Sequence, residues 1–92
     1  MTLTSGRYIG LEYDRMIVLF SMQDGAREIG CAISTSAMDD LERGPKARPE
    51  QREAQFTRLR DRIEACAASK YRACEFEGTP PGIVLRSIDF RG

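Results

Sequence analysis

The sequence predicts a single α+β domain over residues 1–92, in which a small antiparallel sheet of about four strands packs against a long amphipathic helix and a short helix. Three observations support this fold class. Alternating apolar residues surround an Asp-Gly pair at 24–25, which is typical of a β-hairpin. Residues 50–77 contain no glycine or proline and carry apolar residues at helical spacing. With 92 residues, 41% of them hydrophobic, the chain can build one modest core.

The first predicted unit is a three-strand meander over residues 7–34. Asp24 and Gly25 are expected to form a two-residue turn of type I′, in which both residues need a positive φ. This turn pairs Gln23 with Ala26 and places six apolar residues on one face of the hairpin. The six are Met16, Val18, Phe20, Ile29, Cys31 and Ile33.

The first strand of the meander is expected to add Ile9 and Leu11 to the same face, across a tight turn near Tyr13. The opposite face of the sheet carries Ile17, Leu19, Gly30 and Ala32. Because this second face is half apolar, we expect it to be partly covered as well.

A short helix is predicted over residues 36–43. Ser36 and Asp39 have the spacing of a capping box, in which the hydroxyl caps the helix and the acid at the third position reaches back. Gly44 and Pro45 end the helix, because glycine accepts the left-handed cap conformation and proline cannot continue the helix.

A long helix is predicted over residues 50–74, after a linker that ends at Pro49. Its core-facing stripe consists of Phe56, Leu59, Ile63, Cys66, Ala67 and Lys70. Such a helix would be roughly 37 Å long, whereas a compact domain of this size is only about 32 Å across. We therefore expect one end to extend beyond the core, or the helix to break near Ser69.

The remaining segment predicts a loop at 78–82 and a final strand over residues 83–90. The predicted order is therefore strand, strand, strand, helix, helix, strand. The sheet is expected to pack Ile9, Leu11, Met16, Val18, Phe20, Ile29, Cys31 and Ile33 against Phe56, Leu59, Ile63 and Cys66 of the long helix.

The composition argues against most enzyme classes. The chain has no histidine, which excludes Ser-His and Cys-His pairs and imidazole metal ligands. Its three cysteines do not form a Cys-x-x-Cys pair, so neither a zinc site nor a disulfide framework is indicated. We predict no enzyme, no cofactor, and no catalytic or metal site. The short apolar runs and the N-terminal sequence predict no membrane partner and a cytoplasmic location.

The net charge of zero hides a segregation of charge along the chain. Residues 43–62 contain seven basic and three acidic residues. Arginines bind phosphates and carboxylates well, and the candidate partner-binding residues are Arg48, Arg52, Arg58 and Arg62. The alternative is pairing within the chain, for example between Arg60 and Glu64 one helical turn later. A pI of about 6.3 disfavours nucleic acid as the partner.

Two functions are consistent with this sequence. The leading hypothesis is a non-enzymatic binding or regulatory module that self-associates, with a second copy or another protein as its partner. Its basis is the half-apolar second face of the sheet and a long helix that exceeds its core. The alternative is a nucleic-acid-associated regulator that uses the Arg-rich segment 43–62.

The order and spacing of several residues resemble a family of small bacterial proteins known as domain of unknown function 1488. The resemblance extends from Met16 to Phe90. The residues that carry it are Cys31, Ala32, Ile33, Ser34, Ala37, Leu41, Phe56, Arg60, Arg62, Ile63, Glu64 and Ala67. It implies a compact α+β domain, and it supplies no catalytic or binding residues.

Overall fold

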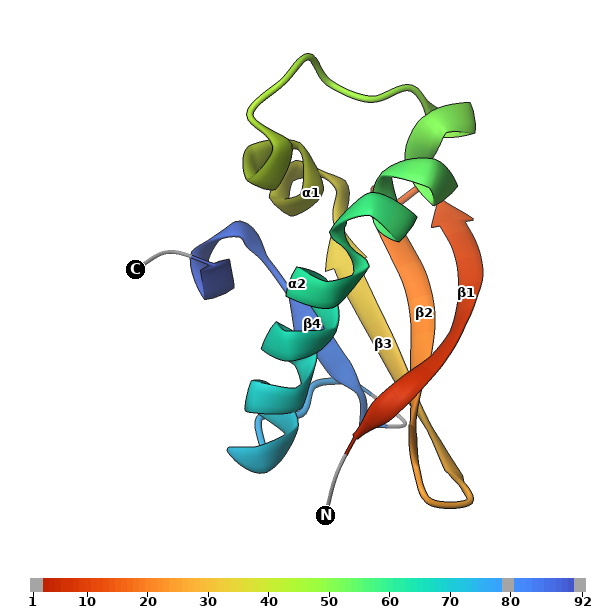
Figure 1. Ribbon diagram of the computed structural model, residues 1–92, viewed down its shortest axis with the longest axis vertical. Coiled ribbons are helices and arrows are strands. Elements are labelled where there is room, and N and C mark those ends of the chain that lie inside the picture. Colours follow the sequence, from red (N-terminus) through yellow and green to blue (C-terminus); the bar gives the residue numbers. More distant parts are fainter. Residues whose placement is uncertain (1–2, 79–80, 91–92) are drawn as a thin grey trace.

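Four strands form one sheet, and a long helix lies across one of its faces (Figure 1). The computed structural model describes residues 3–78 and 81–90. Its strands and helices are β1 (Thr4–Glu12), β2 (Ile17–Asp24), β3 (Arg27–Ser34), α1 (Thr35–Glu42), α2 (Arg52–Arg72) and β4 (Ile83–Leu85), with 3-10 turns at Pro49–Gln51 and Ser87–Phe90. The predicted α+β class and the order of the elements are confirmed.

The strands lie in the order β1-β2-β3-β4, and the last one pairs in the opposite sense to the prediction. β1, β2 and β3 are antiparallel, whereas β4 is parallel to β3, so the sheet is mixed. The reason is the connection through α1 and α2, which returns the chain to the end of the sheet where β3 begins. The final strand is also shorter than predicted. It ends at Leu85, because the carboxylate of Asp89 accepts the N–H of Arg86 and a 3-10 turn follows.

The hairpin of β2 and β3 has the predicted inner face but not the predicted register. Asp24 pairs with Arg27, so the turn residues are Gly25 and Ala26. Of these two residues only Gly25 has a positive φ, at 62°. A positive φ at the first turn residue alone is typical of a type II′ turn, so Asp24 does not need the left-handed conformation. The shift is two residues, and a shift by an even number keeps every side chain on its face. Val18 therefore lies opposite Ile33, in the place that the prediction gave to Met16, and Met22 lies opposite Ile29.

β1 contains two register shifts, and the second one changes which of its residues are buried. Tyr8 lies opposite Phe20 and Leu11 lies opposite Val18, so β1 has one extra residue between these pairs. The bulge turns Ile9 outward, where its side chain is 49% exposed. The prediction of Ile9 as a core residue is therefore wrong, whereas Leu11 packs against the core.

The prediction of Met16 in the core is also wrong. Met16 lies in the turn between β1 and β2 with a φ of 52°, and its side chain is 39% exposed. β2 begins only at Ile17, so the alternation of side chains along the strand does not determine which way Met16 points.

α1 begins one residue before the predicted start and uses a different cap. The hydroxyl of Ser34 accepts the N–H of Ala37 at 3.1 Å, so Ser34 and not Ser36 is the N-cap. The left-handed residue at the other end is Arg43, with a φ of 52°, rather than Gly44. β3 therefore leads directly into α1, and Asp39 is free to bond with α2.

α2 is shorter than predicted and fits the domain. Its 21 residues give a length of roughly 31 Å, against a longest molecular dimension of 36 Å. The helix continues past Ser69 without a break. The expected overhang is absent because the first predicted turn is a separate 3-10 turn at Pro49–Gln51.

The core lies between α2 and the inner face of the sheet. Phe56 is at its centre, with its ring centroid 5.0 Å from that of Phe20 and 5.5 Å from that of Tyr8. Leu59 and Ile63 are buried as predicted, and Cys66 is half-buried beside them. None of the helices in the described part of the chain has the length and apolar character needed to cross a membrane.

Candidate functional site

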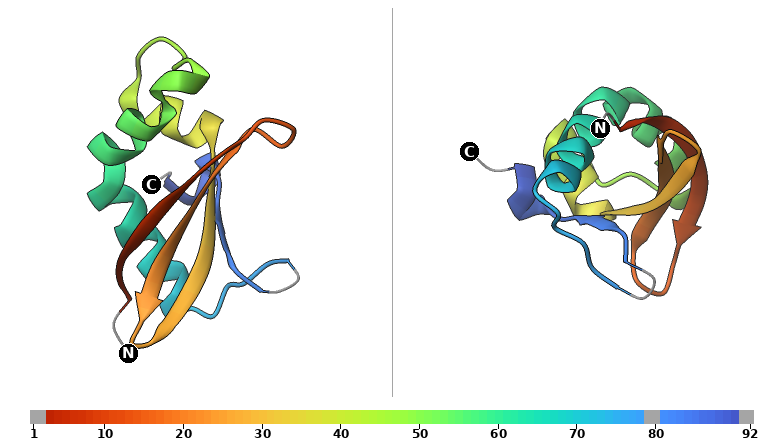
Figure 2. Two further views of the ribbon diagram at one scale, coloured as in Figure 1. Left: turned by 90° about the vertical axis from the view of Figure 1, so that its right-hand side faces the viewer. Right: turned by 90° about the horizontal axis from the view of Figure 1, so that it is seen from below.

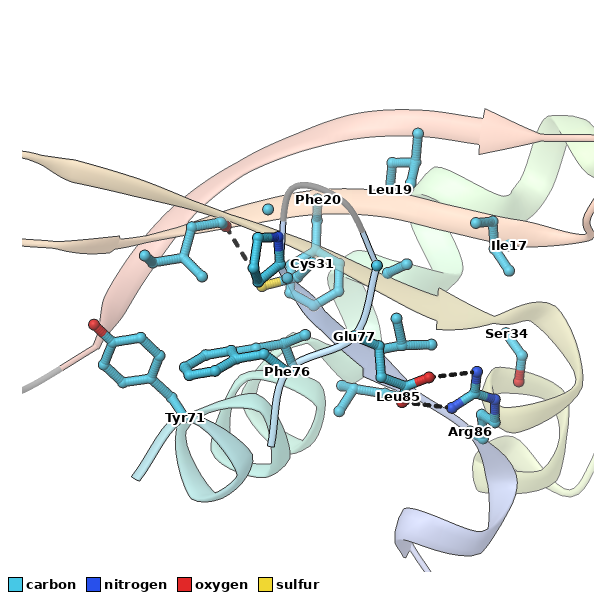
Figure 3. A pocket seen from close by; sticks show the side chains of 18 of the residues that line it. Ile17, Leu19, Phe20, Cys31, Ser34, Tyr71, Phe76, Glu77, Leu85 and Arg86 are labelled. Atoms are coloured by element: carbon cyan, nitrogen blue, oxygen red, sulfur yellow. Dashed lines mark hydrogen bonds and ion pairs between the residues drawn. The ribbon is translucent and has the colours of Figure 1, made fainter. Parts of the chain in front are cut away.

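The outer face of the sheet, directed away from α2, forms a groove of about 1590 Å³ (Figure 3). Successive strand residues point to opposite faces, so the neighbours of core residues line its floor. The floor contains Ile17 and Leu19 from β2, Ala32 from β3 and Val84 from β4. The four residues that the sequence predicts for this face all line the groove, including Gly30.

One wall of the groove comes from the segment between α2 and β4. Phe76 packs edge-on against Tyr71, with ring centroids 5.7 Å apart. Glu77 and Gly82 exchange two backbone hydrogen bonds of 2.8 Å, and the carboxylate of Glu77 accepts from the guanidinium of Arg86 at 2.8 Å (Figure 3). These contacts fix the wall relative to β4.

Two glycines shape the groove beneath this wall. A Cβ at position 82 would lie 2.6 Å from the carbonyl oxygen of Gly30, so only glycine allows this close approach. A Cβ at position 30 would meet no atom within 4 Å. The absence of a side chain at Gly30 therefore leaves open space above the floor.

The rim of the groove carries exposed apolar side chains. Ile9, Phe76 and Ile88 line the groove and are 49%, 40% and 68% exposed. Tyr13 and Met16, also exposed, lie in the turn between β1 and β2. In the left view of Figure 2 this turn and the segment after α2 project from opposite ends of the sheet, on the side away from α2. Three of the five exposed large apolar residues of the described chain thus line the groove.

The charged residues of the rim are mostly paired within the chain. Arg86 pairs with Glu77, and two further pairs join Arg15 to Glu12 at 2.5 Å and Arg7 to Glu28 at 2.9 Å. The guanidinium partner lowers the pKa of each of these three carboxyl groups. The groove therefore combines an apolar floor with a rim whose charges are largely compensated.

The thiol of Cys31 lies beneath the groove floor. Cys31 is buried, and burial raises the pKa of its thiol to about 12. Such a thiol is protonated at neutral pH and is a poor nucleophile. Within residues 3–78 and 81–90, His, Cys, Asp and Glu side chains do not gather in groups of three or more that could hold a metal ion.

One of the four candidate partner-binding arginines, Arg52, is buried and not on the surface. Arg52 is 1% exposed, and its guanidinium donates to the carboxylate of Asp39 at 2.7 and 3.3 Å and to Gln55 at 2.7 Å. The prediction that Arg52 binds a partner is therefore wrong. Its burial follows from its spacing, because Arg52 lies one turn before Phe56 on the core-facing stripe of α2.

The other three candidates are exposed but do not form one site. Arg58 pairs with Glu42 of α1 at 2.8 Å, and the guanidinium holds the pKa of that carboxyl below its usual value. Arg48 and Arg62 make no ion pair with the described residues. Since Arg60 also pairs with Glu64, much of the positive charge of segment 43–62 is compensated within the fold.

The Asp39 network makes stability depend on acid pH. Burial opposes ionisation of Asp39, but hydrogen bonds from Arg52, Gln55 and the N–H of Ala47 outweigh it and lower the pKa of the carboxyl. A lowered folded pKa adds stability above the unfolded value of about 3.9, and this stability is lost as the pH falls through the folded pKa.

We therefore expect the free energy of unfolding to decrease as the pH is lowered below about 4. Asp39→Asn should lower stability at neutral pH and flatten this acid dependence, and Asp40→Asn, an exposed neighbour in α1, is the matched control. Urea unfolding at a series of pH values measures both variants. An unchanged acid slope in Asp39→Asn would contradict the role given to this carboxylate.

Comparison with known proteins identifies one family and one solved structure. The family model described as "Protein of unknown function (DUF1488)" matches residues 7–81. The crystal structure of a protein of unknown function from the DUF1488 family of Shewanella loihica PV-4 superimposes with a TM-score of 0.77, at 19% identity, over 92% of this chain and 93% of that chain. At this identity the likeness shows the shared fold. The comparison with curated proteins gave no match.

Proposed function

The chain belongs to the DUF1488 family, described as proteins of unknown function, and we propose that it is a non-enzymatic binding module that self-associates. The observation that carries this proposal is the apolar groove on the outer face of the sheet, with exposed apolar residues around its rim. Exposed apolar patches that are rimmed by polar residues often mark interaction sites. The resemblance to this family noted from the sequence is confirmed.

The chemistry of the groove supports binding rather than catalysis. Its floor is aliphatic, and the carboxylates on its rim are held by guanidinium groups in ion pairs. A catalytic pocket instead brings together polar groups with pKa values matched to proton transfer. We also propose a cytoplasmic location, because the three cysteines are free thiols, as is typical of a reducing compartment.

Size-exclusion chromatography with light scattering tests self-association. We expect the mass to rise from that of one chain toward that of two as the concentration increases into the high micromolar range. A mass of one chain, 10.4 kDa, across the whole range would contradict the proposed function. Ionic strength should have little effect on the result, because the groove buries apolar surface rather than net charge.

A further inference from the structure

Basic side chains of α2 each cap one backbone carbonyl in the two edge strands of the sheet. Arg60 donates to the backbone carbonyl of Gly6 in β1 at 2.9 Å. At the other edge, Lys70 donates to the backbone carbonyl of Val84 in β4 at 2.8 Å and to Asp89 at 3.2 Å. Unpaired backbone groups at a sheet edge would otherwise allow pairing with a strand of another chain.

The geometry of the edge strands also opposes strand addition. β1 contains two register shifts, which interrupt the regular spacing of its backbone groups. β4 is only three residues long. Short, bulged or capped edges are the means by which folded proteins avoid edge-to-edge association. These features disfavour strand addition, and the outer face is the other surface of the sheet that α2 does not cover (Figure 1).

We infer that two copies of this chain associate by packing the outer face of one sheet against the outer face of the other. This inference rests on the proposed function and specifies its surface and its partner. Two sheets can pack face to face about 10 Å apart, with side chains of both faces forming a shared apolar layer. Ile17, Leu19, Ala32 and Val84 would form the centre of that layer.

The exposed apolar side chains supply part of the surface that such an interface needs. Three large apolar residues that line the groove, Ile9, Phe76 and Ile88, are 40–68% exposed. Aromatic side chains bury roughly 150–250 Å² each when fully covered, so Phe76 on the groove rim adds to the apolar contact. A standard interface buries about 800 Å² on each partner, and the groove floor contributes further area.

The charges of the rim favour a second copy over a strongly charged partner. Among the charged residues that line the groove, Arg15, Glu28, Glu77 and Arg86 are each in an ion pair within the chain. Arg27 is the exception within the described residues. The rim has too little net positive charge to attract a polyanion. Two copies of this rim can come into contact without breaking their ion pairs.

The test compares the dimer dissociation constants of four variants by sedimentation. Leu19→Lys places a charge in the floor, and Ile88→Lys places one at the rim, where the side chain is 68% exposed. Ala65→Lys, on the exposed side of α2, is the matched control. Lys70→Met removes the donor to the Val84 carbonyl while keeping the length of the side chain.

Face-to-face packing predicts that Leu19→Lys and Ile88→Lys each raise the dissociation constant at least about tenfold, because a charge is buried in an apolar contact. Ala65→Lys and Lys70→Met should leave it unchanged. A dimer that survives both lysine substitutions at the groove, or one that tightens in Lys70→Met, would overturn the inference in favour of another surface or of strand addition. In that case the proposed self-association would still stand. A wild-type protein that stays monomeric would contradict both the face-to-face packing and the proposed self-association. Circular dichroism of each variant confirms that it is folded.

Discussion

We expect Arg52→Ala to lower the free energy of unfolding by about 3–5 kcal/mol, because removing one partner of a buried ion pair leaves the other uncompensated. Among residues 3–78 and 81–90, Arg52 is the largest fully buried side chain. Its guanidinium joins α2 to α1 through Asp39 and also donates to the side-chain oxygen of Gln55. The amide group of Gln55 in turn donates to Asp39 and to Glu42. The substitution therefore removes both volume and the donor on which this network depends.

Urea unfolding measures this effect, and two further variants make it specific. Arg62→Ala removes an exposed arginine from the same helix and should change stability by less than about 0.5 kcal/mol. Arg52→Lys keeps the positive charge but cannot reproduce the planar, bidentate contact with Asp39, so it should recover only part of the loss. A stability equal to that of the wild type in Arg52→Ala would show that the buried pair contributes little to holding α1 on α2.

Phe56→Ala should also lower the free energy of unfolding by about 3–5 kcal/mol, since truncating a buried aromatic side chain leaves a cavity. Phe56 is fully buried and contacts the rings of Tyr8 and Phe20. On its other side the guanidinium of Arg60 lies 5.4 Å from the ring centroid. The substitution thus removes contacts with β1, β2 and α2 at once.

The control for Phe56 is its neighbour in sequence. Thr57 is exposed, and Thr57→Ala should change stability by less than about 0.5 kcal/mol. Phe56→Leu keeps much of the volume and should lose less than Phe56→Ala. Thermal and urea unfolding of the three variants give the order of effects, and equal losses in Phe56→Ala and Thr57→Ala would contradict the core described here.

The hairpin shows how far periodicity determines a fold. The alternation of apolar residues in β2 and β3 predicted correctly that Val18 and Phe20 share a face with Cys31 and Ile33. It could not determine the register, because a shift by two residues leaves all faces unchanged. The turn chemistry decides between the two registers, and here Gly25 serves as the first residue of a type II′ turn rather than the second of a type I′ turn.

Tertiary contacts explain the other differences from the predictions. The bulge that turns Ile9 outward is a property of how β1 meets β2, and no local pattern marks it. The burial of Arg52, in contrast, was indicated by the sequence. The apolar stripe of α2, extended back one turn from Phe56, reaches Arg52, and the next residue on the same side is Gln55. Two polar residues in core positions of a helix imply a buried partner, which is Asp39.

The outer face of the sheet was partly predictable. The half-apolar pattern of Ile17, Leu19, Gly30 and Ala32 indicated a second surface that needs cover. The groove itself could not be predicted, because its wall depends on the contact of Phe76 with Tyr71 and the ion pair between Glu77 and Arg86. The second basis for self-association, a helix longer than its core, is not supported by the length of α2. The proposal now depends on the groove.

The most direct test of this proposal is the methyl NMR spectrum of the wild-type protein across a dilution series. If the outer face is the self-association surface, the methyl resonances of Leu19, Val84 and Ile88 shift with concentration. Those of Ala54 and Ala65, on the exposed side of α2, then stay constant. Resonances that are independent of concentration at all five residues, or shifts confined to the two alanines, would contradict the assignment of the groove as the binding surface.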